Sequence, residues 1–246
     1  MNILELEDQP WFPSWMRRMQ TEYIGWLVQR FGVYRPLAPV LADMLERAGA
    51  EAVTDLGAGN GGPTLALAVH PSLHGVSFTL TDLYPSPAIS GLDNVHWHHE
   101  PVDALAMNAQ LPGMRTMFNA FHHFKEADKR RLIAQSGRHG LFVAEILQPD
   151  VWCFLKVVFT TTVGQILMAP IVRPFRLERL FFTWILPVNL FTVTWDGIAS
   201  VIKVDKPKML AQRARESAPL GTATFSGVCG YPWARISWFC VLPERS

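Results

Sequence analysis

A glycine-rich turn near residue 57 could bring the backbone close to a ligand. The stretch "VTDLGAGNGGPTLALAV", residues 53–69, holds Gly57, Gly59, Gly61 and Gly62. Glycine lets the chain adopt positive φ and approach a bound group closely. The G-x-G-x-x-G spacing is that of a dinucleotide-binding turn. A nicotinamide cofactor, another nucleotide-containing ligand and a turn without any ligand are therefore the alternatives.

Asp55 discriminates between these ligands because it lies in the apolar run directly ahead of the turn. A carboxylate beside a pyrophosphate would be repulsive, whereas a buried carboxylate needs a cationic or hydrogen-bonding partner. S-adenosylmethionine carries both an ammonium group and a sulfonium. The residue type at position 55 therefore favours that ligand over NAD.

Further polar side chains follow the next predicted strands. Asp82 ends "GVSFTLTD", and a carboxylate at a strand end can accept hydrogen bonds from two ribose hydroxyls. His122 and His123 follow "RTMFNAF" and are the best general-base candidates in the chain, because imidazole titrates near neutral pH. The alternative for this pair is that one histidine binds backbone and only shapes the loop.

In this order, "VTDLGAGNGGPT", "LTD", "PVDA" and "FNAFHHF" resemble the class I S-adenosylmethionine-dependent methyltransferases over roughly residues 36–148. By that resemblance Asp82 would bind the ribose, Asp103 the adenine amino group, and Asn119 would line the reaction centre. The full donor site that the resemblance implies is Asp55, Gly57, Ala58, Gly59, Gly61, Asp82, Leu83, Val102, Asp103, Ala104 and Asn119. The resemblance also extends to a bacterial small-molecule subgroup of undefined substrate, which shares "DQPWFP", "PFRLERL" and "WDG".

The elements that must position these residues alternate along the chain. Apolar runs predict five strands, and helical spacing predicts helices between them. Two further runs near the C-terminus predict an antiparallel hairpin. We therefore expect an α/β fold, with a doubly wound, Rossmann-like, seven-stranded and mostly parallel sheet in one domain, 1–246. The predicted strands are 52–56, 75–82, 95–100, 115–121, 140–146, 221–228 and 234–242, and the predicted helices are 36–48, 63–69 and 125–138.

Two segments lie outside this alternation. Residues 1–35, with a helix over 14–31, are expected to form a lid that presents Arg18 and Tyr23 to the acceptor. Residues 151–202 are densely apolar and are expected to form a helical cap over the sheet, where Arg173 and Arg176 would anchor an acidic acceptor. Two alternatives remain: these arginines only stabilise the cap, or its helices lie on a membrane surface.

Composition excludes several classes of function. Lys plus Arg is 22 and Asp plus Glu is 21, so no electrostatic footprint for nucleic acid is present. Three cysteines without a C-x-x-C motif indicate neither a disulfide framework nor a metal centre. The acidic start lacks a secretory leader pattern, so a cytoplasmic protein is expected, with peripheral membrane contact left open.

These observations predict a methyltransferase that uses S-adenosylmethionine. The expected acceptor is an O or N atom of a small, fairly apolar molecule, of the kind found in natural product biosynthesis. Two alternatives stay open: a lipid or isoprenoid acceptor at a membrane, and donor binding without methylation. The oligomeric state is not determined by the sequence.

Overall fold

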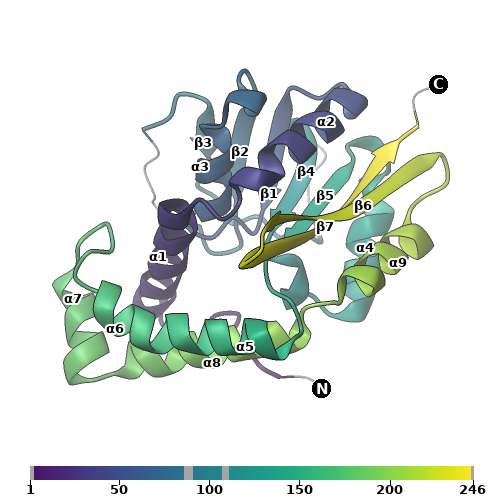
Figure 1. Cartoon of the computed structure of the whole chain (residues 1–246). Coiled ribbons are helices and arrows are strands. Elements are labelled where there is room, and N and C mark those ends of the chain that lie inside the picture. Colours follow the sequence, from purple (N-terminus) through teal and green to yellow (C-terminus); the bar gives the residue numbers. More distant parts are fainter. Residues whose placement is uncertain (1–2, 86–90, 107–110, 245–246) are drawn as a thin grey trace.

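The computed structural model describes residues 3–85, 91–106 and 111–244. A seven-stranded sheet in the order β3-β2-β1-β4-β5-β7-β6 forms its centre (Figure 1). The strands β1 to β5 pair in parallel, and β7 runs antiparallel to both β5 and β6. This confirms the predicted sheet and its C-terminal hairpin. The strands are β1 Ala52–Leu56, β2 Ser77–Thr81, β3 Val95–Trp97, β4 Met114–Phe118, β5 Leu141–Glu145, β6 Thr222–Tyr231 and β7 Ala234–Pro243.

Both faces of the sheet are covered, because the strands alternate apolar side chains between them. In β5, Phe142 and Ala144 belong to one core cluster, which α2 (Ala38–Ala48) and α3 (Gly62–Ala68) cover. Leu141 and Val143 belong to the other, which α4 (Glu126–Ala134) and α9 (Pro207–Ser217) cover. A strand buried on both faces reads as a continuous apolar run, which is how "GLFVAEI" was recognisable in the sequence.

The remaining helices lie together beyond one end of the sheet (Figure 1). The N-terminal helix α1, Ser14–Phe31, packs against α3 and α8. Residues 151–202, called the apolar segment below, hold α5 (Val151–Phe159), α6 (Gln165–Met168), α7 (Leu177–Leu180) and most of α8 (Val188–Lys203). α8 contacts the 3-10 turn η3, Phe121–His123, which directly follows β4. The apolar segment therefore lies at the carboxyl ends of the parallel strands.

The apolar segment departs from ideal α-helix at two places. Thr160–Gly164 and Phe181–Ile185 each form a π-helical turn, η5 and η6. In the first turn, the hydroxyls of Thr160, Thr161 and Thr162 each donate to the carbonyl oxygen four residues earlier. Such back-bonding competes with the regular helical ladder and bends helices. The hairpin also differs in detail from the sequence prediction, because β6 continues through Gly230 to Tyr231.

Candidate active site

The glycine turn is held open to a ligand by its backbone geometry. Gly57, Gly59 and Gly61 all have positive φ, between 55° and 71°. A Cβ atom at Gly61 would lie 2.6 Å from Leu80 Cδ2 and 3.0 Å from the Trp97 ring, so a larger residue there would displace these side chains and hold a strained φ. The amide of Ala58 donates to the carbonyl oxygen of Thr81 over 2.9 Å, which joins the turn to the end of β2.

Asp55 lies beneath this turn and is fully engaged within the protein. It is buried in β1, and it accepts hydrogen bonds from the hydroxyl of Thr64 in α3 and, over 3.1 Å, from that of Thr116 in β4. Burial raises the pKa of Asp55 to about 7, although the two hydroxyls oppose the shift. The carboxylate thus ties the start of α3 to two strands. Its predicted direct role toward the donor ammonium stays a prediction.

Asp82 follows β2 and faces the glycine turn. Its Oδ2 accepts from the amide of Gly59 over 2.7 Å, and its Oδ1 accepts from the amide of Tyr84 over 2.8 Å. Each carboxylate oxygen has a second lone pair, so acceptor capacity for two hydroxyls remains. Burial raises the pKa of Asp82, while these amides and the charges of His123 and Arg17 act in the opposite direction. Leu83, the next residue, is half exposed.

The loop after β3 carries Asp103 to the same edge of the sheet. The amide of Val102 donates to the carbonyl oxygen of Asp82 over 2.8 Å, which fixes the two loops to each other. Asp103 is exposed and accepts from the amide of Leu105 over 2.9 Å, and Ala104 is buried beside it. An exposed carboxylate next to a buried small residue could accept from an amino group at the rim of a pocket.

Asn119 ends β4 in an unusual conformation. Its φ of 56° makes it the one described non-glycine residue with positive φ. Its amide donates to the carbonyl oxygen of Ala144 over 2.8 Å, while its side-chain Oδ1 is buried and has no partner among the described residues. Strained residues and orphaned buried acceptors gather at ligand sites. An ammonium group is one partner that would satisfy this oxygen.

His122 follows in η3 and is held by Glu145, the last residue of β5. The backbone amide of His122 donates to Glu145 Oε1 over 3.0 Å, and its Nδ1 lies 2.8 Å from Oε2. Because a carboxylate only accepts, Nδ1 carries a proton and donates it to Glu145. The other ring nitrogen, Nε2, is buried, with no hydrogen bond to a described residue. It lies 3.9 Å from Glu5 Oε1.

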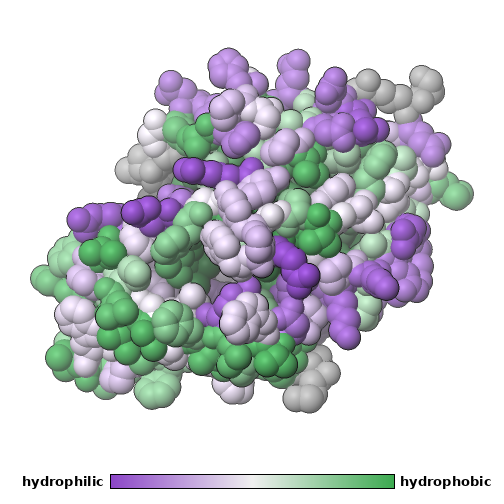
Figure 2. All heavy atoms as spheres, in the orientation of Figure 1, coloured by the Kyte–Doolittle hydropathy of each residue, from purple (hydrophilic) through white to green (hydrophobic). Residues whose placement is uncertain are grey.

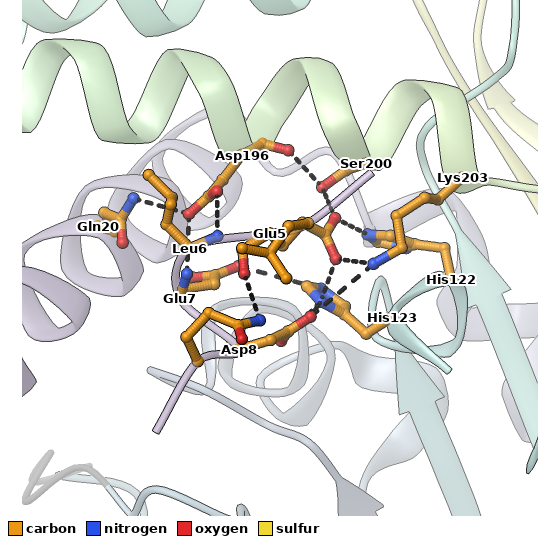
Figure 3. A network of polar contacts seen from close by, with 12 residues as sticks. Glu5, Leu6, Glu7, Asp8, Gln20, His122, His123, Asp196, Ser200 and Lys203 are labelled. Carbon is orange, nitrogen blue, oxygen red and sulfur yellow. Dashed lines mark hydrogen bonds and ion pairs between the residues drawn. The ribbon is translucent and has the colours of Figure 1, made fainter. Parts of the chain in front are cut away.

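His123 shares Glu5 with His122 and belongs to an ionic cluster with the N-terminal segment (Figure 3). Its Nδ1 lies 2.8 Å from Glu5 Oε2 and 3.0 Å from an oxygen of Asp8. Burial disfavours the imidazolium, but the hydrogen bonds to Asp8 and Glu5 hold the pKa of His123 well above its ordinary value. Lys203 of α8 also pairs with Glu5. A protonated His123 is a poor base, which separates the roles of the two adjacent histidines.

Glu5, His122 and His123 also meet the distance requirement for a metal site, with one potential ligand atom from each within 4.8 Å of the others. The chemistry of the cluster does not fit a resident metal ion well. Lys203 and the protonated His123 already compensate the Glu5 carboxylate. These residues therefore form an internally neutralised network.

The predicted acceptor-binding residues lie on α1 and in the apolar segment, but the structure does not gather them around one cavity. Tyr23 is buried and donates to the carbonyl oxygen of Thr160 over 2.5 Å. Arg176 makes a bidentate pair with Glu22, with hydrogen bonds of 2.7–2.9 Å. Arg18 lies 3.7 Å from Glu178, and Arg173 is exposed. Their role toward an acceptor stays a prediction.

Sequence reasoning missed several residues that shape this site. Glu145, Glu5, Glu22 and Asp196 are buried acids whose partners are more than 20 positions away along the chain. Glu145 did carry a signal, because a carboxylate at the end of the apolar run "GLFVAEI" resembles the placement of Asp55. The N-terminal acids carried none, since an acidic surface segment has the same composition.

Comparison with known proteins agrees with this arrangement at the level of fold. Searches against family models and curated sequences returned no match. Among solved structures, human N-acetylserotonin methyltransferase in complex with SAM is similar, with a TM-score of 0.54 and 12% identity. That match covers 95% of this chain and 57% of the human one. The apo form of the S-adenosylmethionine-dependent methyltransferase SibL matches with a TM-score of 0.49 and 13% identity, over 85% of this chain and 55% of that one.

The pyocyanin biosynthetic protein PhzM matches with a TM-score of 0.46 and 12% identity, over 83% of this chain and 54% of that one. The chain thus spans a little more than half the length of these three matched proteins. Identities this low report on architecture alone. The order of strands, the glycine turn after β1 and the antiparallel strand β7 agree with that architecture. This chain therefore has the fold of the S-adenosylmethionine-dependent methyltransferases.

Proposed function

We propose that this protein transfers a methyl group from S-adenosylmethionine to an oxygen or nitrogen atom of a small, fairly apolar acceptor, with His122 as the general base. The His122–Glu145 pair carries the proposal, because it holds a buried imidazole nitrogen, Nε2, that makes no hydrogen bond to a described residue, directly after β4. When bound, S-adenosylmethionine supplies a methyl group activated by a sulfonium.

The donor would be held by the turn from Gly57 to Gly61, by Asp82 and by Asp103. This assignment fits because the three loops are joined by backbone hydrogen bonds at one edge of the sheet. The orphaned Oδ1 of Asn119 adds an acceptor beside the turn. A Cβ at Gly57 would lie 3.2 Å from Ala120 Cβ, so the turn lies directly against the end of β4.

His122 would accept the proton that the acceptor loses. As the acceptor atom bonds to the methyl carbon, the carbon–sulfur bond breaks and the acceptor O–H or N–H proton moves to Nε2. Glu145 keeps the other nitrogen protonated and stabilises the imidazolium that forms. His123 does not compete for this role, because its hydrogen bonds to Asp8 and Glu5 favour its charged form.

A donor-binding measurement and a turnover measurement test the proposal separately. Calorimetry should show binding of S-adenosylhomocysteine and no binding of NAD. Labelled donor incubated with fractionated small-molecule extracts should yield a labelled product, which identifies the acceptor. Binding without any labelled product would support the alternative of donor binding without methylation.

Once an acceptor is known, His122→Gln should lower kcat by about 100-fold or more, the usual contribution of a general base. Its affinity for S-adenosylhomocysteine should stay close to that of the unmodified chain. The half-exposed His98, after β3, provides the matched control, since His98→Gln should leave kcat unchanged. Equal activity of the two variants would remove His122 from the mechanism.

A further inference from the structure

The apolar segment exposes far more hydrophobic surface than the rest of the chain. Seventeen of its large apolar side chains are at least 41% exposed, against nine in the remainder of the described residues. The most exposed are Val151, Trp152, Leu177, Ile185 and Phe191, at 68–75%. Figure 2 shows hydrophobic surface gathered over the region where α5 to α8 lie in Figure 1. The same helices were chosen by the sequence analysis for their apolar character.

These side chains share faces of the helices. On α5, Trp152, Leu155 and Phe159 follow helical spacing, and all three are more than half exposed. On α8, which packs against α5, Phe191 and Trp195 are exposed one turn apart. We call the exposed apolar side chains of residues 151–202 the docking face.

Several charged groups of the same segment are turned away from the docking face, whereas Arg173 and Glu178 are exposed. Arg176 and Arg179 bind Glu22 on α1, and Asp196 accepts from the amides of Leu6 and Glu7. A helix pair that only faces water would have the opposite arrangement, with its charges outward. The structure therefore uses Asp196 of α8 for internal contacts and leaves Phe191 and Trp195 outside, while smaller apolar residues of the helix are buried.

The size of the docking face exceeds what a free surface normally carries. If each side chain offers about 200 Å² and is half exposed, the face is on the order of 1,500 Å². The largest apolar patch of a typical monomer is about 300–600 Å². A standard protein interface buries about 800 Å² on each partner. The docking face is therefore large enough to bind an apolar partner or surface.

Charge and aromatic content favour a lipid surface over a second copy of the chain. Arg173 lies within the apolar segment, and Lys206 and Lys208 follow it along the chain, shortly after α8. All three are exposed, and no ion pair among the described residues involves them. Anionic headgroups would neutralise these cations, whereas a second copy would bring more of the same charge. Trp184 and Trp195 are half exposed, with their ring N–H groups donating to carbonyl oxygens. Half-buried tryptophan is typical of membrane interfaces.

The helices are suited to lie in the interface rather than to cross the bilayer. Within the described residues, Val151–Met168 is long and apolar enough to span a bilayer, with a mean hydropathy of 1.6 and 17% of it buried. Leu177–Ile185 and Val188–Lys203 reach that length and apolar character only when the bent pair is taken as one span. But α8 carries Ser200 and Lys203, which bind Glu5 beside the candidate active site. Insertion across a bilayer would break those contacts.

We propose that the docking face binds the surface of an anionic phospholipid bilayer, with α5 and α8 lying in its interface. This binding does not depend on the proposed methyl transfer. Because α8 also contacts η3, docking places the carboxyl edge of the sheet above the lipid. Acceptors dissolved in the bilayer would then reach the site without crossing water.

Vesicle co-sedimentation of the full chain tests the proposal directly. The chain should sediment with vesicles of phosphatidylcholine and phosphatidylserine, and less with phosphatidylcholine alone. The double variant Trp152→Ser, Phe191→Ser should bind at least about tenfold more weakly, because two large apolar side chains no longer enter the interface. The control Val69→Ser, Leu220→Ser removes exposed apolar groups elsewhere and should bind as the unmodified chain does.

A second variant tests the electrostatic part of the proposal without removing any apolar side chain. Arg173→Gln, Lys206→Gln, Lys208→Gln should abolish the preference for anionic vesicles and leave S-adenosylhomocysteine binding and melting temperature unchanged. The proposal is overturned if the unmodified chain stays in the supernatant with anionic vesicles. It is also overturned if light scattering shows a dimer that Trp152→Ser, Phe191→Ser dissociates, because the face would then belong to a second copy.

Discussion

A buried ion pair joins α1 to the apolar segment, and we expect its loss to be the most damaging charge change in the protein. Glu22 on α1 accepts from Arg179 over 2.6 Å and from Arg176 over 2.7–2.9 Å. The side chain of Arg179 is 0% exposed, and that of Glu22 is 5% exposed. Glu22→Ala would therefore leave a guanidinium buried without its counter-charge.

Removing one partner of a buried pair costs about 3–5 kcal/mol. The lower end applies here, because Arg179 also donates to the carbonyl oxygens of Val172 and Pro174 over 3.2 and 3.0 Å. We therefore expect Glu22→Ala to lower the free energy of unfolding by about 3 kcal/mol. For a chain of this length, that corresponds to a decrease in Tm of roughly 6–12 °C.

Urea unfolding followed by circular dichroism would measure this change. The control is Glu178→Ala, since that carboxylate is 60% exposed and lies 3.7 Å from Arg18. Its loss should alter stability by less than about 0.5 kcal/mol. The double variant Glu22→Leu, Arg179→Met should recover most of the loss, because neither charge remains buried. A single variant as stable as the control would refute the reasoning, as would a double variant no better than Glu22→Ala.

Three further outcomes follow from the site. Stability should be highest between about pH 4.5 and 6.5. The pKa of Glu5 is lowered in the folded state, so the stability that this carboxylate contributes is lost as the pH falls below the ordinary pKa of glutamate. The pKa of His123 is raised in the folded state, so the stability that this imidazolium contributes is lost as the pH rises through the folded pKa, and His123→Gln should flatten the alkaline side of a plot of Tm against pH. Gly61→Ala should abolish S-adenosylhomocysteine binding and lower Tm. The control Gly221→Ala should only lower Tm slightly, because Gly221 also has positive φ but a Cβ there meets open space. Equal effects of the two variants would show that the close approach of residue 61 to Leu80 is unimportant. Asp82→Ala should weaken S-adenosylhomocysteine binding by about 1.5–3 kcal/mol in calorimetry, and unchanged affinity would show that this carboxylate does not bind the ribose.

Much of the fold could be predicted because its signals are local. The apolar runs of β1 and β5, the helix over 14–31 and the C-terminal hairpin were all recognisable from periodicity and turn residues. Short parallel strands separated by helices leave few alternatives for topology. The ends of elements were less predictable, as in β3, which stops at Trp97 rather than continuing to Glu100. The end of such a strand depends on how far the neighbouring strand, here β2, continues to pair with it.

The residues of the candidate site likewise divide into those that local sequence signals predict and those that depend on distant partners. The glycine turn, Asp82 and Asn119 could be placed at one edge of the sheet because each follows a parallel strand. The distinction between His122 and His123 could not be made, since they are adjacent and chemically identical. It depends on Glu145, 23 residues further on, and on Glu5, which lies far back in the chain.

The sequence by itself determined what local chemistry controls: which segments are strands and helices, which turn needs glycine, and which end of the sheet collects polar groups. The tertiary structure decided which partner each buried charge meets, as with Glu22 and Arg179, separated by 157 positions. It also decided that the large apolar residues Trp152 of α5 and Phe191 and Trp195 of α8 face outward, although such residues are equally suited to a core. Side-chain pairing and exposure depend on the packing of distant segments, whereas propensity, periodicity and backbone strain act within a few residues.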